Sequence, residues 1–314
     1  MKKKNNEILK KTLIILSFAY FYLFIVSVYP TDYSTTLPGD TKSTEEIFKI
    51  ENHNVFSMDT IFVITYSPLT YLQKSIIEFI SNDNISKTND FNKENNNIEK
   101  YKIGQIQKQN SFNKSAILAY KKANKFIDYS FYGYVNLSNS SNDIKVGDII
   151  RSINDIELVE GIDFQQFQSI NIYKIELIRK NKMVRLEYQN QNPDIKLYLD
   201  SYYEINSSMP AISLSNELDF IGGPSGGLIT ALSIYASLKQ LVLEYKISGT
   251  GVISLNGEVK PVGGLIQKYY TAYSNSDFFM IPSSQLEIFN SVENSKIIPI
   301  SNFDEAINFL ENLK

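Results

Sequence analysis

A serine and a lysine in the C-terminal third of the chain have the surroundings that nucleophilic catalysis requires. Ser225 lies in the glycine-rich stretch GGPSGG at 222–227, and Lys268 ends the stretch PVGGLIQK at 261–268. A serine hydroxyl becomes a nucleophile when a neighbouring base takes its proton. A lysine can be that base only when burial lowers its pKa from about 10.4 toward about 7 to 8. Apolar and aromatic residues around Lys268 favour such burial, so the pair predicts a peptidase.

The composition leaves few other catalytic groups. The chain has one histidine, His53, far upstream of Ser225, and no cysteine. A Ser-His-Asp triad must therefore use His53, while thiol catalysis, thiolate metal sites and disulfides are excluded. A histidine-rich zinc site is excluded as well, so neither a metal nor a cofactor is predicted. The net charge of −3, with no basic stripe in the folded part, argues against a nucleic-acid partner.

The elements that must position Ser225 are readable around it. Asp219–Ile221 is expected to end a strand, the glycines break it, and 228–243 has the composition of a mostly apolar helix. Ser225 would then lie at or near a helix N-terminus, where unpaired backbone N–H groups suit a developing oxyanion. By itself, a serine in a glycine-rich turn is more often a helix cap or an anion-binding nest, and a lone lysine is more often a surface charge. Only their combination favours catalysis.

Two further strands are expected between the serine and the lysine. The stretch 247–260 predicts a hairpin with its turn at Asn256-Gly257. Thr250, in the first of these strands, could hydrogen-bond to the amine of Lys268 and orient it.

The first thirty residues carry a membrane signal. Five lysines lie before Thr12–Tyr29, a stretch of eighteen residues (29 − 12 + 1) without charge. As a helix it would be roughly 27 Å long, which just spans a bilayer. The charge asymmetry predicts a single-pass cell-membrane protein with a cytoplasmic tail (1–11), an anchor (12–29) and an extracytoplasmic remainder. A cleaved signal peptide is the alternative, although no small-x-small cleavage site follows the apolar stretch.

Residues 30–127 are predicted to contain strands and helices separated by a polar segment. Strands are expected at 47–50 and 60–66, and helical spacing of apolar residues is found at 69–80 and 111–127. The stretch 81–100 is almost entirely Asn, Lys, Asp, Glu, Ser and Thr, which predicts a flexible, solvated loop.

Residues 128–190 form a separate unit that resembles a PDZ domain. The resemblance rests on IKVGDIIRSIND at 144–155, followed by a hairpin around 180–182. Asp155 stands where the family usually has glycine. PDZ domains bind a peptide as an added strand at an open sheet edge and capture its carboxylate with backbone N–H groups. The resemblance implies that Tyr132, Gly133, Tyr134 and Val135 bind the peptide; an unrelated small β domain is the alternative.

The chain as a whole resembles the membrane-anchored, PDZ-containing Lon-type serine peptidases of bacteria. The matching stretches are GPSGG at 223–227, where the family usually has alanine in place of Gly226, GTG at 249–251, GEV at 257–259, PVGG at 261–264, and Lys268. The resemblance implies that Ser225 is the nucleophile, Lys268 the general base and Thr250 an accessory hydrogen-bonding residue. Gly223, Pro224 and Gly226 are accessory residues around the nucleophile. The ATP-binding motif of full Lon proteases, GxxxxGK[ST], is absent, which predicts ATP-independent action.

These observations predict an α+β chain with an N-terminal transmembrane helix, a PDZ-like domain and a Lon-type proteolytic domain at 191–314. Because 191–314 is small for a Lon-type domain, residues 30–127 are expected to supply its missing strands and helix. The PDZ-like unit would then be inserted into the peptidase. The predicted function is an endopeptidase acting on extracytoplasmic proteins or peptides, with the PDZ-like unit recruiting or gating substrate. A catalytically silent PDZ scaffold is the alternative, and a homo-oligomer is compatible with either because Lon-type domains often form rings.

Overall fold

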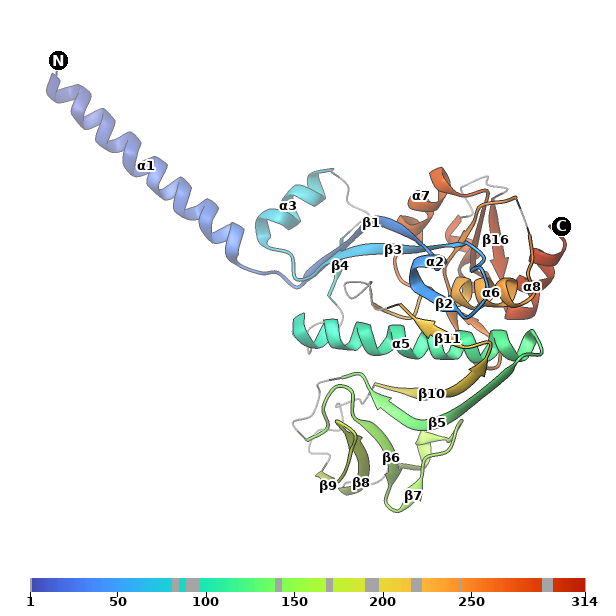
Figure 1. Cartoon of the computed structure of the whole chain (residues 1–314). Helices are drawn as coiled ribbons and strands as arrows, with labels where there is room; N and C mark the ends of the chain where they lie inside the picture. Colours follow the sequence, from blue (N-terminus) through green and yellow to red (C-terminus); the bar gives the residue numbers. More distant parts are fainter. Residues whose placement is uncertain are drawn as a thin grey trace. The chain divides into compact units, whose positions relative to one another are not determined.

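The structure is a computed structural model of the 314-residue chain (Figure 1). It describes residues 2–80, 85–88, 97–138, 143–167, 172–189, 198–215, 222–242, 244–289 and 296–313, so the strand expected at 219–221 lies outside the described residues. The chain divides into two compact units. Unit 1 comprises Met1–Leu37 with Val63–Lys93, and unit 2 comprises Pro38–Phe62 with Glu94–Lys314. Both units contain helices and strands, which confirms the α+β class.

Unit 1 contains the N-terminal apolar helix. α1 (Lys2–Val28) includes Glu7–Val28, which is long and apolar enough to cross a membrane; a signal sequence has the same features. After it, the first part of β1 (Tyr33–Ser43) pairs antiparallel with β4 (Ile85–Lys87), and α3 (Tyr71–Ile80) lies between the strands in sequence. The loop predicted at 81–100 is wrong at β4, where Ser34 and Thr35 of β1 provide pairing partners that composition does not reveal.

The main sheet of unit 2 is parallel at its centre. Its order is β16-β15-β12-β3-β1, and β12 runs parallel to both β3 and β15. These strands are β3 (Asp59–Tyr66), β12 (Ile247–Gly249), β15 (Phe278–Pro282) and β16 (Ile297–Ile300). Two short pairs accompany the sheet: β2 (Phe48–Ile50) with β11 (Ile212–Leu214), and β13 (Val252–Ile253) with β14 (Val259–Lys260). The predicted hairpin at 247–260 is therefore divided, because β12 ends at Gly249 in the main sheet and only β13 and β14 form the hairpin.

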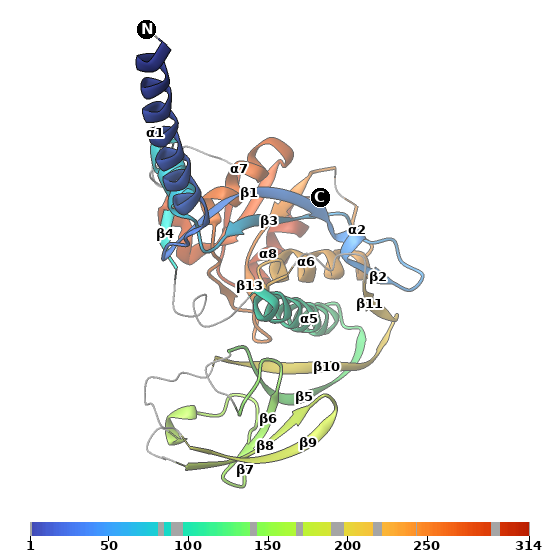
Figure 2. The same cartoon turned by 90° about the vertical axis from the view of Figure 1, so that its left-hand side faces the viewer.

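Helix α6 (Gly227–Leu238) is the centre of unit 2. All of its residues are buried, because it lies between the main sheet and α5 (Asn97–Lys122) (Figures 1 and 2). A helix that is apolar on every side requires such a position. It ends at Leu238 rather than at Leu243, since Gln240 has the left-handed φ of 52° that is typical of a helix C-terminus. The remaining helices are α2 (Thr44–Ile47), α7 (Leu265–Asn275), α8 (Phe303–Glu311) and the 3-10 turns η2 (Phe164–Phe167) and η3 (Ser283–Phe289).

Helix α5 is longer than its sequence predicts. Its C-terminal half, from Asn110 to Tyr120, is largely buried against α6 and neighbouring strands. The half before it is mainly polar and consists largely of Lys and Gln, with one Glu and one Asn. These polar residues, apart from Asn, are good helix formers, so the buried half can extend into them. The prediction of a loop up to residue 100 and of a helix up to 127 is therefore wrong at both ends. Asn124, with a φ of 56°, ends the helix and leads into β5.

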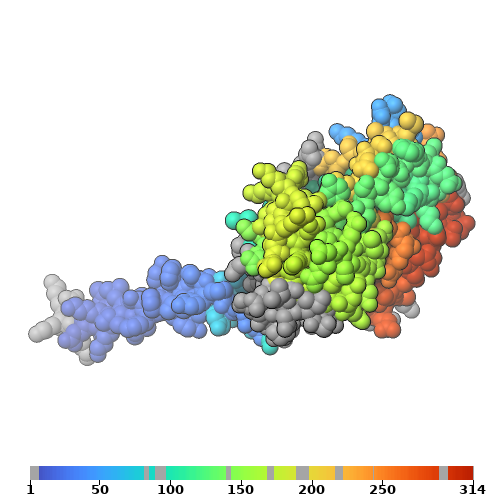
Figure 3. All heavy atoms as spheres, turned by 90° about the horizontal axis from the view of Figure 1, so that it is seen from below, coloured from blue at the N-terminus to red at the C-terminus, as the bar shows by residue number. Residues whose placement is uncertain are grey.

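A second sheet in unit 2 has its own core, and it forms the yellow-green part of the face in Figure 3. Its order is β10-β5-β6-β8-β9, with β7 paired to β6. The strands are β5 (Phe126–Asn136), β6 (Ile149–Ile153), β7 (Ile156–Glu157), β8 (Ile172–Arg179), β9 (Lys182–Gln189) and β10 (Leu199–Met209). Lys180 and Asn181 have φ values of 50° and 60°, as a two-residue hairpin turn requires. Asp155 has a φ of 63°, so a short polar residue occupies a backbone conformation that favours glycine.

The predicted peptide-binding residues of the second sheet have no open strand edge. Tyr134 and Val135 of β5 pair with β6 on one side and with Ser201 and Asp200 of β10 on the other. Gly133 pairs with β10 as well, and Tyr132 lies at a bulge between paired positions. Tyr132, Gly133, Tyr134 and Val135 thus lie in a strand rather than in the loop expected of them, and β10 occupies the edge beside them; their role in peptide binding stays a prediction.

The outer edge of β10 is covered by side chains of α5. Asn110 donates to the carbonyl oxygen of Ser201 at 2.8 Å, and Asn113 donates to that of Tyr203 at 2.7 Å. Lys114 forms an ion pair with Asp200 at 2.8 Å. Amide side chains thus replace the ladder that another strand would form, and they attach the second sheet to the helix that also contacts the candidate site.

Segments that precede the second sheet in sequence pair with segments that follow it. β2 precedes it in sequence and pairs with β11, which follows it. Ser248 and Gly249 of β12 pair with Asp59 and Thr60 of β3. The part of 47–66 that lies in unit 2 therefore packs with the C-terminal strands, which is the arrangement that an inserted second sheet requires.

Candidate active site

The Ser225 loop, residues 222–226, leads into α6, and its glycines permit a close approach to α5. Gly223 has a φ of 95°, and its N–H donates to the carbonyl oxygen of Gly104 at 2.9 Å. A Cβ atom on Gly222 would lie 2.8 Å from the Cα atom of Gly104, which no side chain tolerates. Ser225 itself is half-buried, two residues before the first residue of α6, so its hydroxyl remains accessible.

Lys268 reaches Ser225 from α7. Its Nζ atom lies 2.8 Å from the Oγ atom of Ser225 and 2.8 Å from the Oγ1 atom of Thr250. The sequence explains the inward direction: Leu265 and Ala272, one turn away on either side, are buried on the same face of α7. The lysine is only 2% exposed. The structure thus brings together the three residues that the sequence singled out for the chemistry.

The environment of Lys268 makes it a proton acceptor near neutral pH. Burial disfavours the ammonium form and lowers the pKa of Lys268 to about 8. Among the residues that the structure describes, no carboxylate forms an ion pair with this amine, so nothing offsets the loss of hydration. A substantial fraction of the amine is therefore neutral at mildly basic pH.

Thr250 fixes the direction of the amine. Its hydroxyl donates to the carbonyl oxygen of Ser225 at 3.0 Å, so its lone pairs are left to accept from Lys268. A neutral amine that donates to Thr250 directs its own lone pair toward Ser225. The N–H of Gly251 donates to the same carbonyl at 2.8 Å, and the N–H of Leu228 donates to Gly251. The serine, the threonine and the start of α6 are thereby held as one hydrogen-bonded group.

Two serines of α5, which the sequence analysis missed, hold the other side of the loop. Ser111 donates to the carbonyl oxygen of Pro224 at 3.1 Å, and Ser115 donates to that of Gly227 at 2.9 Å. The two hydroxyls are one helical turn apart and are both buried. In the sequence, the only sign of this role was the pair of serines four residues apart in a predicted helix. It could not reveal their partners, which lie more than a hundred positions away.

Free backbone donors remain beside the nucleophile. The N–H of Gly227 donates to Pro224 at 3.1 Å and is occupied. Within the described part of the chain, the N–H groups of Ser225 and Gly226 have no acceptor. They belong to the loop just before α6, where the helix dipole favours negative charge. An oxyanion formed at a carbonyl attacked by Ser225 could bind there.

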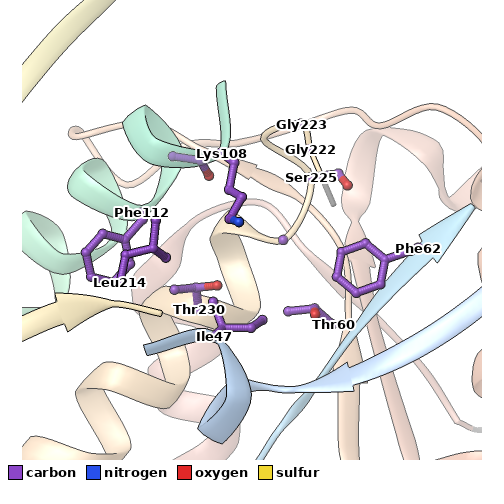
Figure 4. Close-up of a pocket in the computed structure, with 12 residues that line it drawn as sticks. Ile47, Thr60, Phe62, Lys108, Phe112, Leu214, Gly222, Gly223, Ser225 and Thr230 are labelled. Carbon is purple, nitrogen blue, oxygen red and sulfur yellow. The ribbon is translucent and has the colours of Figure 1, made fainter. Parts of the chain in front are cut away.

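A small pocket of about 50 Å³ opens beside Ser225 (Figure 4). Its walls are mainly apolar, and they come from α2, β3, α5, β11 and the Ser225 loop. The lining residues are Ile47, Thr60, Phe62, Lys108, Ser111, Phe112, Leu214, Gly222, Gly223, Ser225, Gly226 and Thr230. The pocket is suited to an apolar side chain next to a bond that Ser225 attacks.

The remaining candidates from the sequence lie elsewhere. Nδ1 of His53 lies 2.9 Å from the carbonyl oxygen of Glu51, and in the part of the chain that the structure describes the ring has no hydrogen bond to Ser225. In the described ranges, no group of three or more His, Asp or Glu residues could hold a metal ion.

Gly226 can accept the alanine that the resemblance leads one to expect. It has the ordinary right-handed φ of −83°, and an added Cβ atom would lie 3.4 Å from the Cγ2 atom of Thr60. We expect Gly226→Ala to raise the free energy of unfolding by about 0.4 to 1 kcal/mol, because it restricts the unfolded chain without strain in the folded one. Urea unfolding measures this change, and Ser225 should remain reactive. The matched control is Gly222→Ala, which should destabilise the protein because of the contact with Gly104; equal effects of the two changes would contradict the geometry.

Comparison with known proteins agrees with this geometry. Residues 219–309 match the Lon protease (S16) C-terminal proteolytic domain. The chain is 35% identical over 89 residues to Lon protease 2 of Bacillus subtilis (strain 168). The aligned region covers 28% of this chain and 16% of that protein. It is 28% identical over 147 residues to the Lon protease of Mycoplasma mobile, covering 44% of this chain and 17% of the relative.

A third relative, the Lon protease of Neorickettsia sennetsu, is 36% identical over 93 residues, which are 28% of this chain and 11% of that protein. The chain thus spans less than a fifth of the length of these relatives. The segment that matches the proteolytic-domain family, residues 219–309, contains Ser225, Thr250 and Lys268. The C-terminal part of the chain is therefore homologous to the proteolytic domain of Lon-type serine proteases.

Proposed function

We propose that the protein is a serine endopeptidase with a Ser225-Lys268 dyad, anchored in a membrane by α1 and acting without ATP. The observation that carries the proposal is the 2.8 Å contact between the Nζ atom of a buried lysine and the Oγ atom of an accessible serine. The pKa of this lysine, lowered to about 8, suits a general base. The homology of residues 219–309 to a proteolytic domain supports the same chemistry.

The proposed reaction begins with the neutral amine of Lys268. It accepts the proton of Ser225 as Oγ forms a bond to the carbonyl carbon of the substrate. The resulting oxyanion accepts hydrogen bonds from the N–H groups of Ser225 and Gly226. The C–N bond then breaks, and the leaving amine takes the proton from Lys268. Water then attacks the acyl carbon as Lys268 takes its proton. The C–Oγ bond breaks, and Lys268 returns that proton to Ser225.

The proposed substrates are extended or locally unfolded segments of extracytoplasmic proteins. The pocket of about 50 Å³ beside Ser225 would receive a small apolar side chain of the substrate. We expect the protein not to unfold stable domains before cleaving them, since the sequence contains no GxxxxGK[ST] motif that would bind ATP. Part of the proposal is that the second sheet is a PDZ-like unit that gates or recruits substrate. The contacts of Asn110 and Asn113 with β10 give it a route to the Ser225 loop through α5.

Membrane anchoring is proposed from the character of α1. An 18-residue stretch within Glu7–Val28 has a mean hydropathy of 1.9 and is not buried in the molecule. Thr12 and Ser27 donate their hydroxyls to the carbonyl oxygens of Ile8 and Leu23, one turn earlier. Because these hydroxyls form hydrogen bonds within the helix, they do not need water. This suits the interior of a bilayer, which contains none. The lysines that precede the apolar stretch favour a cytoplasmic N-terminus.

The proposal is tested with the full chain in detergent. We expect it to cleave unfolded casein and to react with a fluorophosphonate probe. Both activities should vanish in Ser225→Ala, because the other hydroxyl that Lys268 contacts, that of Thr250, is fully buried and donates to the carbonyl oxygen of Ser225. Ser274→Ala, an exposed serine on α7, is the matched control and should retain both. If the wild type neither cleaves nor reacts but still binds peptides, the protein is a scaffold and the proposed function is wrong.

A further inference from the structure

We propose that α3 (Tyr71–Ile80) is a membrane-surface helix that lies in the headgroup region of the bilayer beside the point where α1 leaves it. The occupant of its apolar face would be lipid. The inference rests on the proposed anchoring of the chain through α1, and it concerns unit 1 alone.

Three apolar side chains in the second half of α3 form an exposed stripe, whereas Leu72 and Ile77 are half-buried. Phe79 is 93% exposed, Ile80 is 76% exposed and Ile76 is 49% exposed, and no residue of the helix is buried. At about 100° per residue, these three side chains fall within roughly 100° of one another around the helix axis. A continuous apolar stripe of this kind on a short helix is the pattern that interfacial helices present to lipid.

The least exposed residues of α3 are Leu72, Lys74 and Ile77, and Lys74 contacts the protein through an aromatic ring. The Nζ atom of Lys74 lies 4.6 Å from the centre of the Tyr33 ring, and Lys74 also pairs with Glu78 one turn later. A helix on the surface of a protein in water normally buries its apolar side and exposes its polar side. In α3 the stripe of Ile76, Phe79 and Ile80 stays exposed, so an apolar environment on that side would stabilise the helix.

Backbone hydrogen bonds hold α3 at the end of α1. The N–H of Tyr71 donates to the carbonyl oxygen of Tyr29 at 3.2 Å, and the N–H of Thr31 donates to that of Leu69 at 2.7 Å. Pro30 and Thr70 form a β-bridge between these two bonds. Figures 1 and 2 show α3 beside the C-terminal end of α1. Since α1 ends at Val28, a chain anchored by α1 brings the first turn of α3 to the membrane surface, where the apolar stripe can enter the lipid.

The chain has no tryptophan, which gives the test a single reporter. Full-length Phe79→Trp is reconstituted into vesicles of phosphatidylcholine and phosphatidylglycerol whose acyl chains carry bromine close to the headgroup. Emission should be blue-shifted and reduced by about half or more, because the apolar side of an interfacial helix lies about 5–10 Å into the headgroup and acyl boundary. Bromine at the bilayer centre should quench it less.

Two further single-tryptophan variants complete the experiment. Glu78→Trp, one residue earlier and on the polar side of α3, is the matched control and should be quenched much less than Phe79→Trp. Phe18→Trp, in the middle of α1, should be quenched most strongly by bromine at the bilayer centre. Reaction of Ser225 with the fluorophosphonate probe verifies that each variant is folded, and it reports on the peptidase proposal separately.

The outcomes are distinct. Quenching of positions 18 and 79 together with weak quenching at position 78 supports the inference. Quenching at position 18 without quenching at position 79 leaves the anchor in place and overturns the lipid contact of α3. A blue-shifted but unquenched position 79 overturns it too, since a protein surface then covers the stripe. An absence of quenching at position 18 overturns the anchor and the inference together, while leaving the dyad unaffected.

Discussion

Lys268→Arg should abolish turnover as completely as Lys268→Ala, with a loss of about 10⁴-fold or more in kcat/KM. An arginine keeps the positive charge, but its pKa lies above about 12, so it holds its proton at any working pH and cannot accept one from Ser225. Conservation of charge should therefore not conserve activity. The measurement is the rate of peptide cleavage by the full chain, with saturation kinetics to separate kcat from KM.

The control for Lys268→Arg is the same substitution at an exposed lysine. Lys260→Arg changes a residue of β14 that lies on the surface, and it should leave the rate within about twofold, as surface substitutions usually do. The wild-type rate should rise with pH through an apparent pKa near 8, as the amine of Lys268 loses its proton. If Lys268→Arg retains a tenth of the wild-type rate, Lys268 is not the base. His53→Ala then tests the remaining candidate.

Lys268→Met should remove activity and at the same time change how stability depends on pH. The pKa of Lys268 is about 8 in the folded protein and about 10.4 in an unfolded chain, so the unfolded state binds the proton more tightly. Below pH 8 the folded protein carries the full cost of a buried ammonium, roughly 3 kcal/mol. That cost is relieved as the pH rises from about 8 to about 10.4. Methionine has a similar volume and no charge, so the variant lacks this dependence.

The measurement is urea unfolding of wild type and Lys268→Met at pH 7 and pH 10. Other titrating groups are common to both proteins and cancel in the difference between their unfolding free energies. The advantage of the methionine variant should shrink by roughly 2–3 kcal/mol between the two pH values. At pH 7 the free energy of unfolding of Lys268→Met should exceed that of the wild type by less than this cost. The reason is that methionine removes the hydrogen bonds of the amine to Ser225 and Thr250. A difference that does not change with pH would mean that the pKa of Lys268 is not lowered.

The family resemblance and the composition together were sufficient to select Ser225, Thr250 and Lys268 as candidate catalytic residues. With one histidine and no cysteine, few residue types could activate Ser225, and Lys268 had apolar neighbours at helical spacing. The homology of residues 219–309 supports this selection, and Nζ of Lys268 lies within hydrogen-bond distance of both Ser225 and Thr250. These features are local: a glycine-rich turn, a helix and its buried face depend on residues close together in the chain.

The sequence was less informative wherever a contact joins distant segments. Tyr132–Val135, expected in a peptide-binding loop, lie in β5 and pair with β10, which starts more than sixty positions later. Periodicity carries no information about which strand takes which edge. The helix predicted at 111–127 begins at Asn97, although its polar residues by themselves indicated a loop. In both cases a tertiary contact outweighed a weak local preference.

The sequence by itself determined the candidate catalytic residues, the apolar character of α1 and the burial of α6, because composition and helical spacing act over a few turns. Only the tertiary structure decided that Ser111 and Ser115 hold the Ser225 loop. It also decided that Ile76, Phe79 and Ile80 of α3 stay exposed. Hydrogen bonds between segments a hundred positions apart, and the side that a helix turns toward its neighbours, are set by the packing of the whole chain, which no local pattern encodes.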